Sequence, residues 1–304
     1  MFSMKFVKIL KNIINKTIRF FIKVLLRCFI CLPRKIQYLF GYALGMLWWD
    51  IIRLRRDIVL ENLEIAFPKM TTSEKSALAR RSIINMGKSF VEHTWMPFYT
   101  SENYINDFVF EGIEYLEQAR AKGKGVCLLA LHLGNGDMAL AGMSLKGLPI
   151  MLISKKFKLK WLNDIWFEMR GRLGTEFISP RNSSYAILKG LKKQKIVIFV
   201  HDQFMGPPTG AKTLFFGKET GTALGLAVMS YRSKAPVVPV FTFRREDGKT
   251  QVEYLPEVPF EEYDDRDHSM VYMTQKYNSI IEDLIRQHPD QWMWVHRRWK
   301  KFII

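Results

Sequence analysis

The stretch 126-VCLLALHLGNGDMALAG-142 contains the change of pattern that decides the fold. Six apolar residues lead to His132, two glycines and an asparagine follow within four positions, and apolar residues resume after Asp137. An unbroken apolar run predicts a strand that is buried on both faces, and the glycine-rich turn predicts entry into a helix. We therefore expect a strand–turn–helix unit with His132 at the end of its strand.

Short apolar runs of the same kind recur downstream and alternate with segments of helical spacing. This alternation predicts an α/β fold with a mainly parallel central sheet flanked by helices. The expected strands lie within 125–131, 148–154, 195–201, 235–243 and 251–256, and the expected helices within 137–146, 158–173, 183–193, 221–233 and 269–287.

The N-terminal segment combines apolar residues with regularly spaced basic ones. Arg19, Lys23 and Arg27 recur every four residues, so a helix there would carry one basic stripe beside an apolar surface. Residues 38–49 form an uncharged run that ends in two tryptophans. These features favour helices that lie in a membrane interface, with a single spanning helix or a buried core helix as alternatives.

The length of 304 residues suits one large α/β domain with an N-terminal extension. We assign residues 1–52 to basic and apolar membrane-anchoring helices. Residues 53–304 form the α/β domain, which begins with a helical arm over 53–100 and continues into the predicted sheet.

Basic residues are concentrated in two parts of the chain. The whole chain has 46 Lys+Arg and 29 Asp+Glu, a net charge of +17. Residues 1–60 hold 12 basic and 2 acidic side chains (+10), and residues 151–200 hold 11 and 3 (+8), so the remainder is close to neutral. Such zones predict anionic partners: a membrane, a phosphorylated substrate or an acidic protein. We expect no nucleic-acid partner, because the basic zones match no known nucleic-acid-binding module.

His132 is the main candidate for catalysis, since sites in parallel sheets lie outside the carboxyl ends of the strands. A turn at Gly134–Gly136 can fold Asp137 back onto the ring. The carboxylate would then fix the tautomer and leave the other nitrogen as a general base for a hydroxyl. A capped turn with a hydrogen-bonded histidine is the alternative. We expect no metal and no covalent intermediate, because neither a second ligand at suitable spacing nor a nucleophilic Ser or Cys accompanies His132.

Several spaced motifs together resemble one enzyme family. The pattern His132-x4-Asp137 resembles the His-x4-acid motif of the glycerolipid and lipid A acyltransferases, and 130-ALHLGNGD-137 is close to the form typical of the late acyltransferases of lipid A biosynthesis, which transfer lauroyl or myristoyl chains. The resemblance covers about residues 35–300 and implies a glycerolipid acyltransferase-like fold. The other similar stretches, in the family's order, are 60-LENLEIAFP-68, 169-MRGRLGTEFI-178, 200-VHDQ-203, 215-FFGKETGTA-223, 235-APVVPVF-241 and 289-PDQWMWVHRRWK-300.

The resemblance implies a membrane-associated O-acyltransferase at the cytoplasmic face of the bacterial inner membrane. It would move a fatty acyl chain from an acyl carrier protein thioester to a hydroxyl of an anionic, phosphorylated lipid A precursor. His132 would act as the base and Asp137 as its orienting group, with no cofactor besides the thioester co-substrate. The alternatives are a related acyltransferase for a glycolipid, lysophospholipid or aminolipid, and a basic membrane-binding protein without activity.

The resemblance also implies roles for residues around this pair. Asn135 and Gly134 are expected to support the site, where the Asn135 amide or backbone donors would steady the oxyanion. Arg170 is expected to hold a phosphate or to orient the site, with a solvated helix arginine as the alternative. Asp202 and Gln203 end the strand 195–200 and would lie beside His132 if both strands are parallel. Asp202 is expected to pair with Arg170, with a helix or turn cap as the alternative. The substrate-binding candidates are Arg170, Asp202, Gln203, Arg297 and Arg298.

The chain departs from the family's usual motif immediately before and at the acid. Gly136 and Asp137 stand where the family usually has an aromatic residue and Glu. Because Asp is one methylene shorter, we expect the helix to approach the His132 ring more closely.

Overall fold

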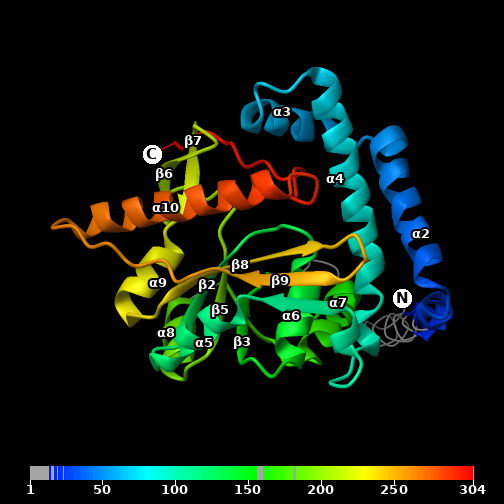
Figure 1. Cartoon of the computed structure of the whole chain (residues 1–304), viewed down its shortest axis with the longest axis horizontal. Coiled ribbons are helices and arrows are strands. Elements are labelled where there is room, and N and C mark those ends of the chain that lie inside the picture. Colours follow the sequence, from blue (N-terminus) through cyan, green and yellow to red (C-terminus); the bar gives the residue numbers. More distant parts are fainter. Residues whose placement is uncertain are drawn as a thin grey trace, which may run out of the picture.

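A seven-stranded sheet forms the centre of the protein, with helices on both of its faces (Figure 1). The computed structural model describes residues 14, 17–18, 20–22, 24–155, 160–180 and 183–303. The strands are β1 (Phe108–Glu111), β2 (Val126–Ala130), β3 (Ile150–Ile153), β4 (Glu176–Ile178), β5 (Ile196–Val200), β8 (Val237–Arg244) and β9 (Thr250–Tyr254).

The order across the sheet is β1-β9-β8-β2-β5-β3-β4. The five neighbouring strands from β8 to β4 are parallel, whereas β9 runs antiparallel to β8 and pairs in parallel with β1. The predicted α/β class with a mainly parallel sheet is therefore confirmed.

The helices on both faces of the sheet explain why the central strands do not alternate apolar and polar residues. Leu128 of β2 packs with apolar residues of α5 and α6, whereas Cys127 and Leu129 pack with α8, α9 and α10 on the opposite face. Both faces of β2 are thus buried, which is why its sequence carries no polar alternation. The helices are α2 (Arg34–Met46), α3 (Arg56–Ala66), α4 (Thr72–His93), α5 (Ile113–Ala121), α6 (Gly136–Leu145), α7 (Lys160–Gly171), α8 (Ser183–Lys192), α9 (Gly225–Ser233) and α10 (Arg266–Gln287), with short helical turns at Leu47–Ile52, Met96–Phe98 and Tyr104–Asn106.

A separate antiparallel hairpin precedes α9 and corrects one predicted helix. Strands β6 (Gly210–Phe215) and β7 (Lys218–Ala223) pair with each other, and their turn places Phe216 and Gly217 at positive φ. The helix expected over 221–233 therefore begins only at Gly225. Thr220 and Thr222 are fully buried in β7, where β-branched side chains are favoured.

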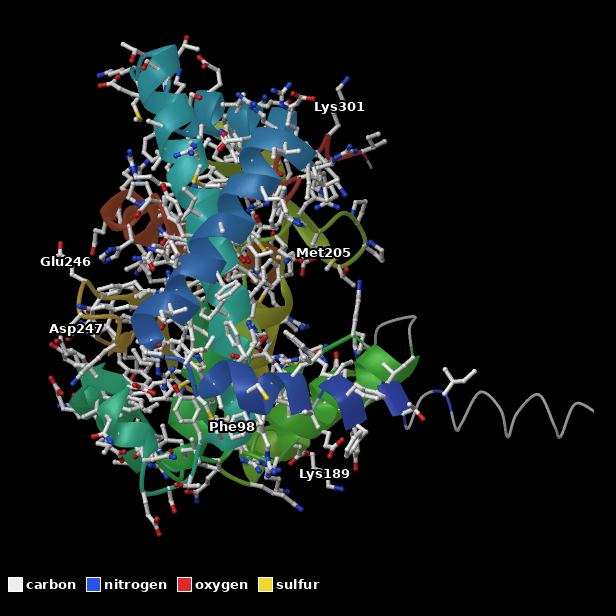
Figure 2. All side chains as sticks on the ribbon, turned by 90° about the vertical axis from the view of Figure 1, so that its right-hand side faces the viewer. Phe98, Lys189, Met205, Glu246, Asp247 and Lys301 are labelled. Atoms are coloured by element: carbon white, nitrogen blue, oxygen red, sulfur yellow. The ribbon has the colours of Figure 1, made fainter. Side chains whose placement is uncertain are left out.

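Helix α2 lies along α4 (Figures 1 and 2). Glycines allow the two helices to approach closely. A Cβ atom added to Gly41 would lie 2.7 Å from the Cα of Lys88, so only a residue without a side chain permits this approach. The outer surface of α2 and the following turn is apolar and exposed, with Leu39 at 63% and Ile51 at 72%. Within the described residues, no helix is both long and apolar enough to cross a membrane.

Two expectations for the N-terminal part stay predictions. Arg19 and Lys23 of the expected basic stripe lie outside the described residues. The division of the chain at residue 52 also stays a prediction, although the contact between α2 and α4 ties the two parts together.

Candidate active site

The register of two adjacent parallel strands brings His132 and Asp202 together. Ala130 at the end of β2 pairs with Val200 at the end of β5, and each candidate lies two residues further along its strand. The Nδ1 atom of His132 lies 2.8 Å from Oδ1 of Asp202, and the His132 backbone N–H donates to Oδ2 over 2.8 Å. Trp292 Nε1 donates to the same Oδ2 over 2.7 Å.

Asp202 is held as a carboxylate against the Nδ1 edge of the histidine ring. Only 2% of Asp202 is exposed. Burial alone would raise the pKa of its carboxyl, but the charge of His132 and the hydrogen bonds from His132 and Trp292 outweigh burial and hold that pKa well below its usual range. An ionised carboxylate only accepts, so the hydrogen-bond network assigns a proton to Nδ1 of His132.

The Nε2 atom of His132 is consequently the basic nitrogen. Burial alone lowers the pKa of His132, but the Asp202 carboxylate and the charge of Asp137 raise it above its ordinary value. The side chain of His132 is 36% exposed, and the Gln203 amide lies 3.3 Å from Nε2, within donating distance. Gln203, a candidate for substrate binding, thus contacts the basic nitrogen itself, and its role in binding substrate stays a prediction.

The expected contact between His132 and Asp137 is wrong, because Asp202 occupies the Nδ1 side of the ring. Asp137 lies in the first turn of α6 and is turned toward α4 and α7 instead. Its Oδ1 pairs with Arg170 Nη2 at 2.6 Å and its Oδ2 with His93 Nε2 at 3.1 Å. The expected pairing of Arg170 with Asp202 is also wrong, because Arg170 pairs with Asp137 and Asp202 accepts from His132 and Trp292.

His93, Asp137 and Arg170 form an ionic cluster next to the first pair. Burial alone would raise the pKa of Asp137, but the hydrogen bond from His93 and the charges of Arg170, His93 and His132 lower it. Arg170 is 7% exposed, and its guanidinium carbon lies 5.5 Å from the Trp166 ring centroid and 4.5 Å from that of Phe177. The carboxylate of Asp137 therefore lies between two cationic partners.

These two clusters lie on a chain that matches a known family along almost its whole length. The model of the bacterial lipid A biosynthesis acyltransferase family matches residues 4–301. The chain belongs to this family. The protein is thus an O-acyltransferase, as the spaced motifs predicted.

The curated relatives of this acyltransferase include two enzymes of Escherichia coli (strain K12). Lipid A biosynthesis lauroyltransferase is 26% identical over 273 residues, which cover 88% of this chain and 87% of the relative. Lipid A biosynthesis palmitoleoyltransferase is 27% identical over 273 residues, which cover 88% and 86%. Among solved structures, the 1-acyl-sn-glycerophosphate (LPA) acyltransferase PlsC of Thermotoga maritima matches with 14% identity and a TM-score of 0.37, covering 83% of this chain and 96% of that one.

Asn135 and Gly134 shape the turn of the acyltransferase, and their donors already have partners. Asn135 caps α6 by accepting from Met138 N–H at 3.3 Å, while its Nδ2 donates to Glu92 Oε2 at 2.9 Å and to the Ser89 carbonyl at 3.2 Å. Gly134 has φ of 58° and donates its N–H to a carbonyl of the C-terminal segment over 2.9 Å. This geometry supports the predicted structural role of both residues and does not support their role as oxyanion donors.

Arg298 also differs from its prediction as a substrate-binding residue. It is fully buried, donates from Nη1 to the Gly221 carbonyl and from Nη2 to Thr222 Oγ1, both at 2.6 Å, and packs over Phe215 at 4.5 Å. Burial lowers its pKa to about 10. Arg298 therefore braces the β6–β7 hairpin. Arg297 is exposed, and its role in substrate binding stays a prediction.

Three further residues of the site were not among the predicted site residues, although Trp292 lies in the C-terminal stretch that resembles the family. Trp292 and His93 contact the two carboxylates described above. Glu92, which is 1% exposed, accepts from Tyr38 of α2 at 3.1 Å, from Asn135, and from Arg244 of β8. The helical spacing of α4 identified only its apolar face. Among the described residues, no group of three or more His, Cys, Asp and Glu side chains could hold a metal ion.

Proposed function

We propose that this acyltransferase transfers a fatty acyl chain from an acyl carrier protein thioester to a hydroxyl of a lipid A precursor, with His132 as general base and Asp202 as its orienting group. The observation that carries this proposal is the buried Asp202 carboxylate on Nδ1 of a ring whose side chain is 36% exposed. A histidine fixed in this tautomer is suited to take a proton at Nε2.

The reaction follows from the position of that nitrogen. Nε2 of His132 takes the hydroxyl proton while the acceptor oxygen attacks the thioester carbonyl carbon, and the acceptor hydroxyl takes the place of the Gln203 amide. Asp202 remains ionised and stabilises the resulting imidazolium. When the tetrahedral intermediate collapses, the carbon–sulfur bond breaks, and the proton on Nε2 passes to the departing thiolate. The products are an ester and a free thiol, so no cofactor is needed.

The choice of substrates rests on the family and on charge. The named relatives are lauroyl- and palmitoleoyltransferases of lipid A biosynthesis. The net charge of +17 favours an acidic carrier protein and a phosphorylated acceptor. A lysophospholipid, glycolipid or aminolipid acceptor is the outcome that would replace this assignment.

We further propose that the acyltransferase lies at the cytoplasmic face of the bacterial inner membrane. The apolar face of α2 and its following turn offers exposed side chains, including Leu39, Phe40, Ile51 and Ile52. Arg53 and Arg55 follow this turn and are exposed, so they could contact anionic lipid headgroups. This arrangement supports binding in the plane of the interface.

The proposed function is tested by acyl transfer with the purified full chain. The wild-type protein should convert acyl carrier protein thioester and a lipid A precursor into a product one acyl chain heavier by mass spectrometry. His132→Ala should abolish transfer and leave vesicle binding intact, while His268→Ala, at an exposed site, should change neither. Transfer to lysophospholipid but not to the lipid A precursor would show that the proposed acceptor is wrong.

A further inference from the structure

The site contains a second histidine–carboxylate pair, His93 and Asp137. His93 is the last residue of α4, and its neighbour Glu92 holds Asn135 at the start of α6. Two consecutive residues of α4 thus contact the catalytic turn at two positions, 135 and 137. The ring of His93 also stacks on Trp166 of α7, with centroids 4.9 Å apart.

Both ring nitrogens of His93 face groups that only accept. Nδ1 lies 2.6 Å from the carbonyl oxygen of Ser89, and Nε2 lies 3.1 Å from Oδ2 of Asp137. A carbonyl has no proton to donate, and Asp137 is held as a carboxylate by Arg170 at 2.6 Å. Each nitrogen of His93 therefore carries a hydrogen, which makes the ring an imidazolium.

We propose that His93 is a positioning residue for acyl transfer, a protonated imidazole that together with Arg170 fixes the Asp137 carboxylate beside His132. This inference rests on the proposed function, since the charge of Asp137 matters to the reaction through His132, whose pKa it raises. The side chains of His93 and Asp137 are each only 17% exposed, so water screens their interaction weakly. The family motif that names Asp137 assigns nothing to position 93.

Loss of the proton on Nε2 of His93 would turn its attractive contact with Asp137 into a repulsive one. If Nδ1–H stays on the Ser89 carbonyl, the Nε2 lone pair faces the carboxylate and repels it. The charged groups around His93 are Asp137 of α6, Arg170 of α7 on that same carboxylate, Glu92 of α4, and Arg244 of β8, which pairs with Glu92. The cationic form of His93 is the one that both of its hydrogen bonds require, because their acceptors are a carbonyl oxygen and a carboxylate oxygen.

The signs of the two ionisations predict a bell-shaped pH profile. Burial alone lowers the pKa of His93, but the hydrogen bond and charge of Asp137 raise it above its ordinary value, so the protonated form persists until pH rises through that raised value. His132 acts as a base only when neutral, above its own raised pKa. Activity should rise as His132 loses its proton and fall as His93 loses its proton.

The test compares kcat and KM of the full chain between about pH 5.5 and 9 for wild type, His93→Gln and His93→Phe. Glutamine can still donate to Asp137 but does not titrate. The fall in kcat at alkaline pH should therefore disappear, while kcat at the pH optimum stays within about tenfold of wild type. Phenylalanine keeps the ring stack but has no donor, so kcat should fall by about 10–100-fold with little change in KM. His268→Phe, at an exposed position, is the matched control and should follow wild type.

A second readout does not depend on activity. With ¹⁵N-histidine in the full chain, the six histidines can be resolved by NMR, and His93 is assigned from the signals lost in His93→Gln. Both nitrogens of His93 should be protonated at neutral pH. A neutral His93 ring there, or equal loss of kcat in His93→Gln and His93→Phe with an unchanged pH profile, would overturn the proposal. If His132→Ala is inactive while both His93 variants match wild type, the proposed function stands and the role of His93 fails.

Discussion

Replacing Asp202 with Asn separates the pair seen in the structure from the pair that the sequence spacing favours. Asp202 accepts three hydrogen bonds, two from His132 and one from Trp292. The single carbonyl oxygen of Asn can serve two of these donors, and the third would face the amide N–H₂. One unsatisfied buried donor costs about 1–3 kcal/mol, which is the expected fall in the free energy of unfolding.

The effect on the rate should be larger than the effect on stability. In Ser-His-Asp triads the same change lowers kcat by about 10,000-fold, because the histidine is held in the wrong tautomer. We expect the kcat of Asp202→Asn, per folded molecule, to fall by about 1,000–10,000-fold. Asp137→Asn should lose about 10–100-fold, since it only supports the charge of the site.

The assay measures initial rates of acyl transfer with thermal unfolding recorded on the same samples. Because the folded pKa of Asp202 is lowered, its stabilisation is complete above its ordinary pKa of about 3.9 and fades as pH falls below it. The stability difference between wild type and Asp202→Asn should therefore shrink in acid. If Asp202→Asn kept its activity within about tenfold while Asp137→Asn was inactive, Asp137 and not Asp202 would be the partner of His132 in catalysis.

Three further substitutions test contacts outside the first pair. Gly41→Leu should push α2 from α4, lowering the melting temperature and vesicle binding, whereas Gly225→Ala, with nothing within 4 Å of its added Cβ, should do neither. Arg298→Lys should lower the free energy of unfolding by about 1.5–3 kcal/mol in denaturant titrations, with KM of the folded enzyme unchanged. Glu92→Ala leaves Arg244 buried without its carboxylate and should lower the free energy of unfolding by about 3–5 kcal/mol in the same titrations. A denaturation midpoint equal to that of wild type would contradict this expectation.

Much of the architecture could be predicted because burial leaves a direct trace in the sequence. Strands β2 and β5 are unbroken apolar runs, since both of their faces are covered, and His132 marks the end of one of them. The β6–β7 hairpin was missed because 218-KETGTA-223 is polar and small, and its buried threonines form hydrogen bonds instead of an apolar pattern.

The partners in the site could not be assigned from spacing along the chain. Asp137 is five residues from His132, whereas Asp202 is seventy residues away and reaches the ring because β5 is the neighbour of β2. That neighbour relation is a property of the sheet order, which skips β3. Arg298 shows a similar limit: it lies in an irregular segment without periodicity, so its burial leaves no pattern in the sequence.

General-base catalysis by His132 is tested most directly by the product mass after a lipid A precursor and acyl carrier protein thioester are incubated with wild-type or His132→Ala protein. We expect a gain of one acyl chain with wild type and none with His132→Ala, although both proteins should bind vesicles equally. Full conversion by His132→Ala would contradict general-base catalysis by His132.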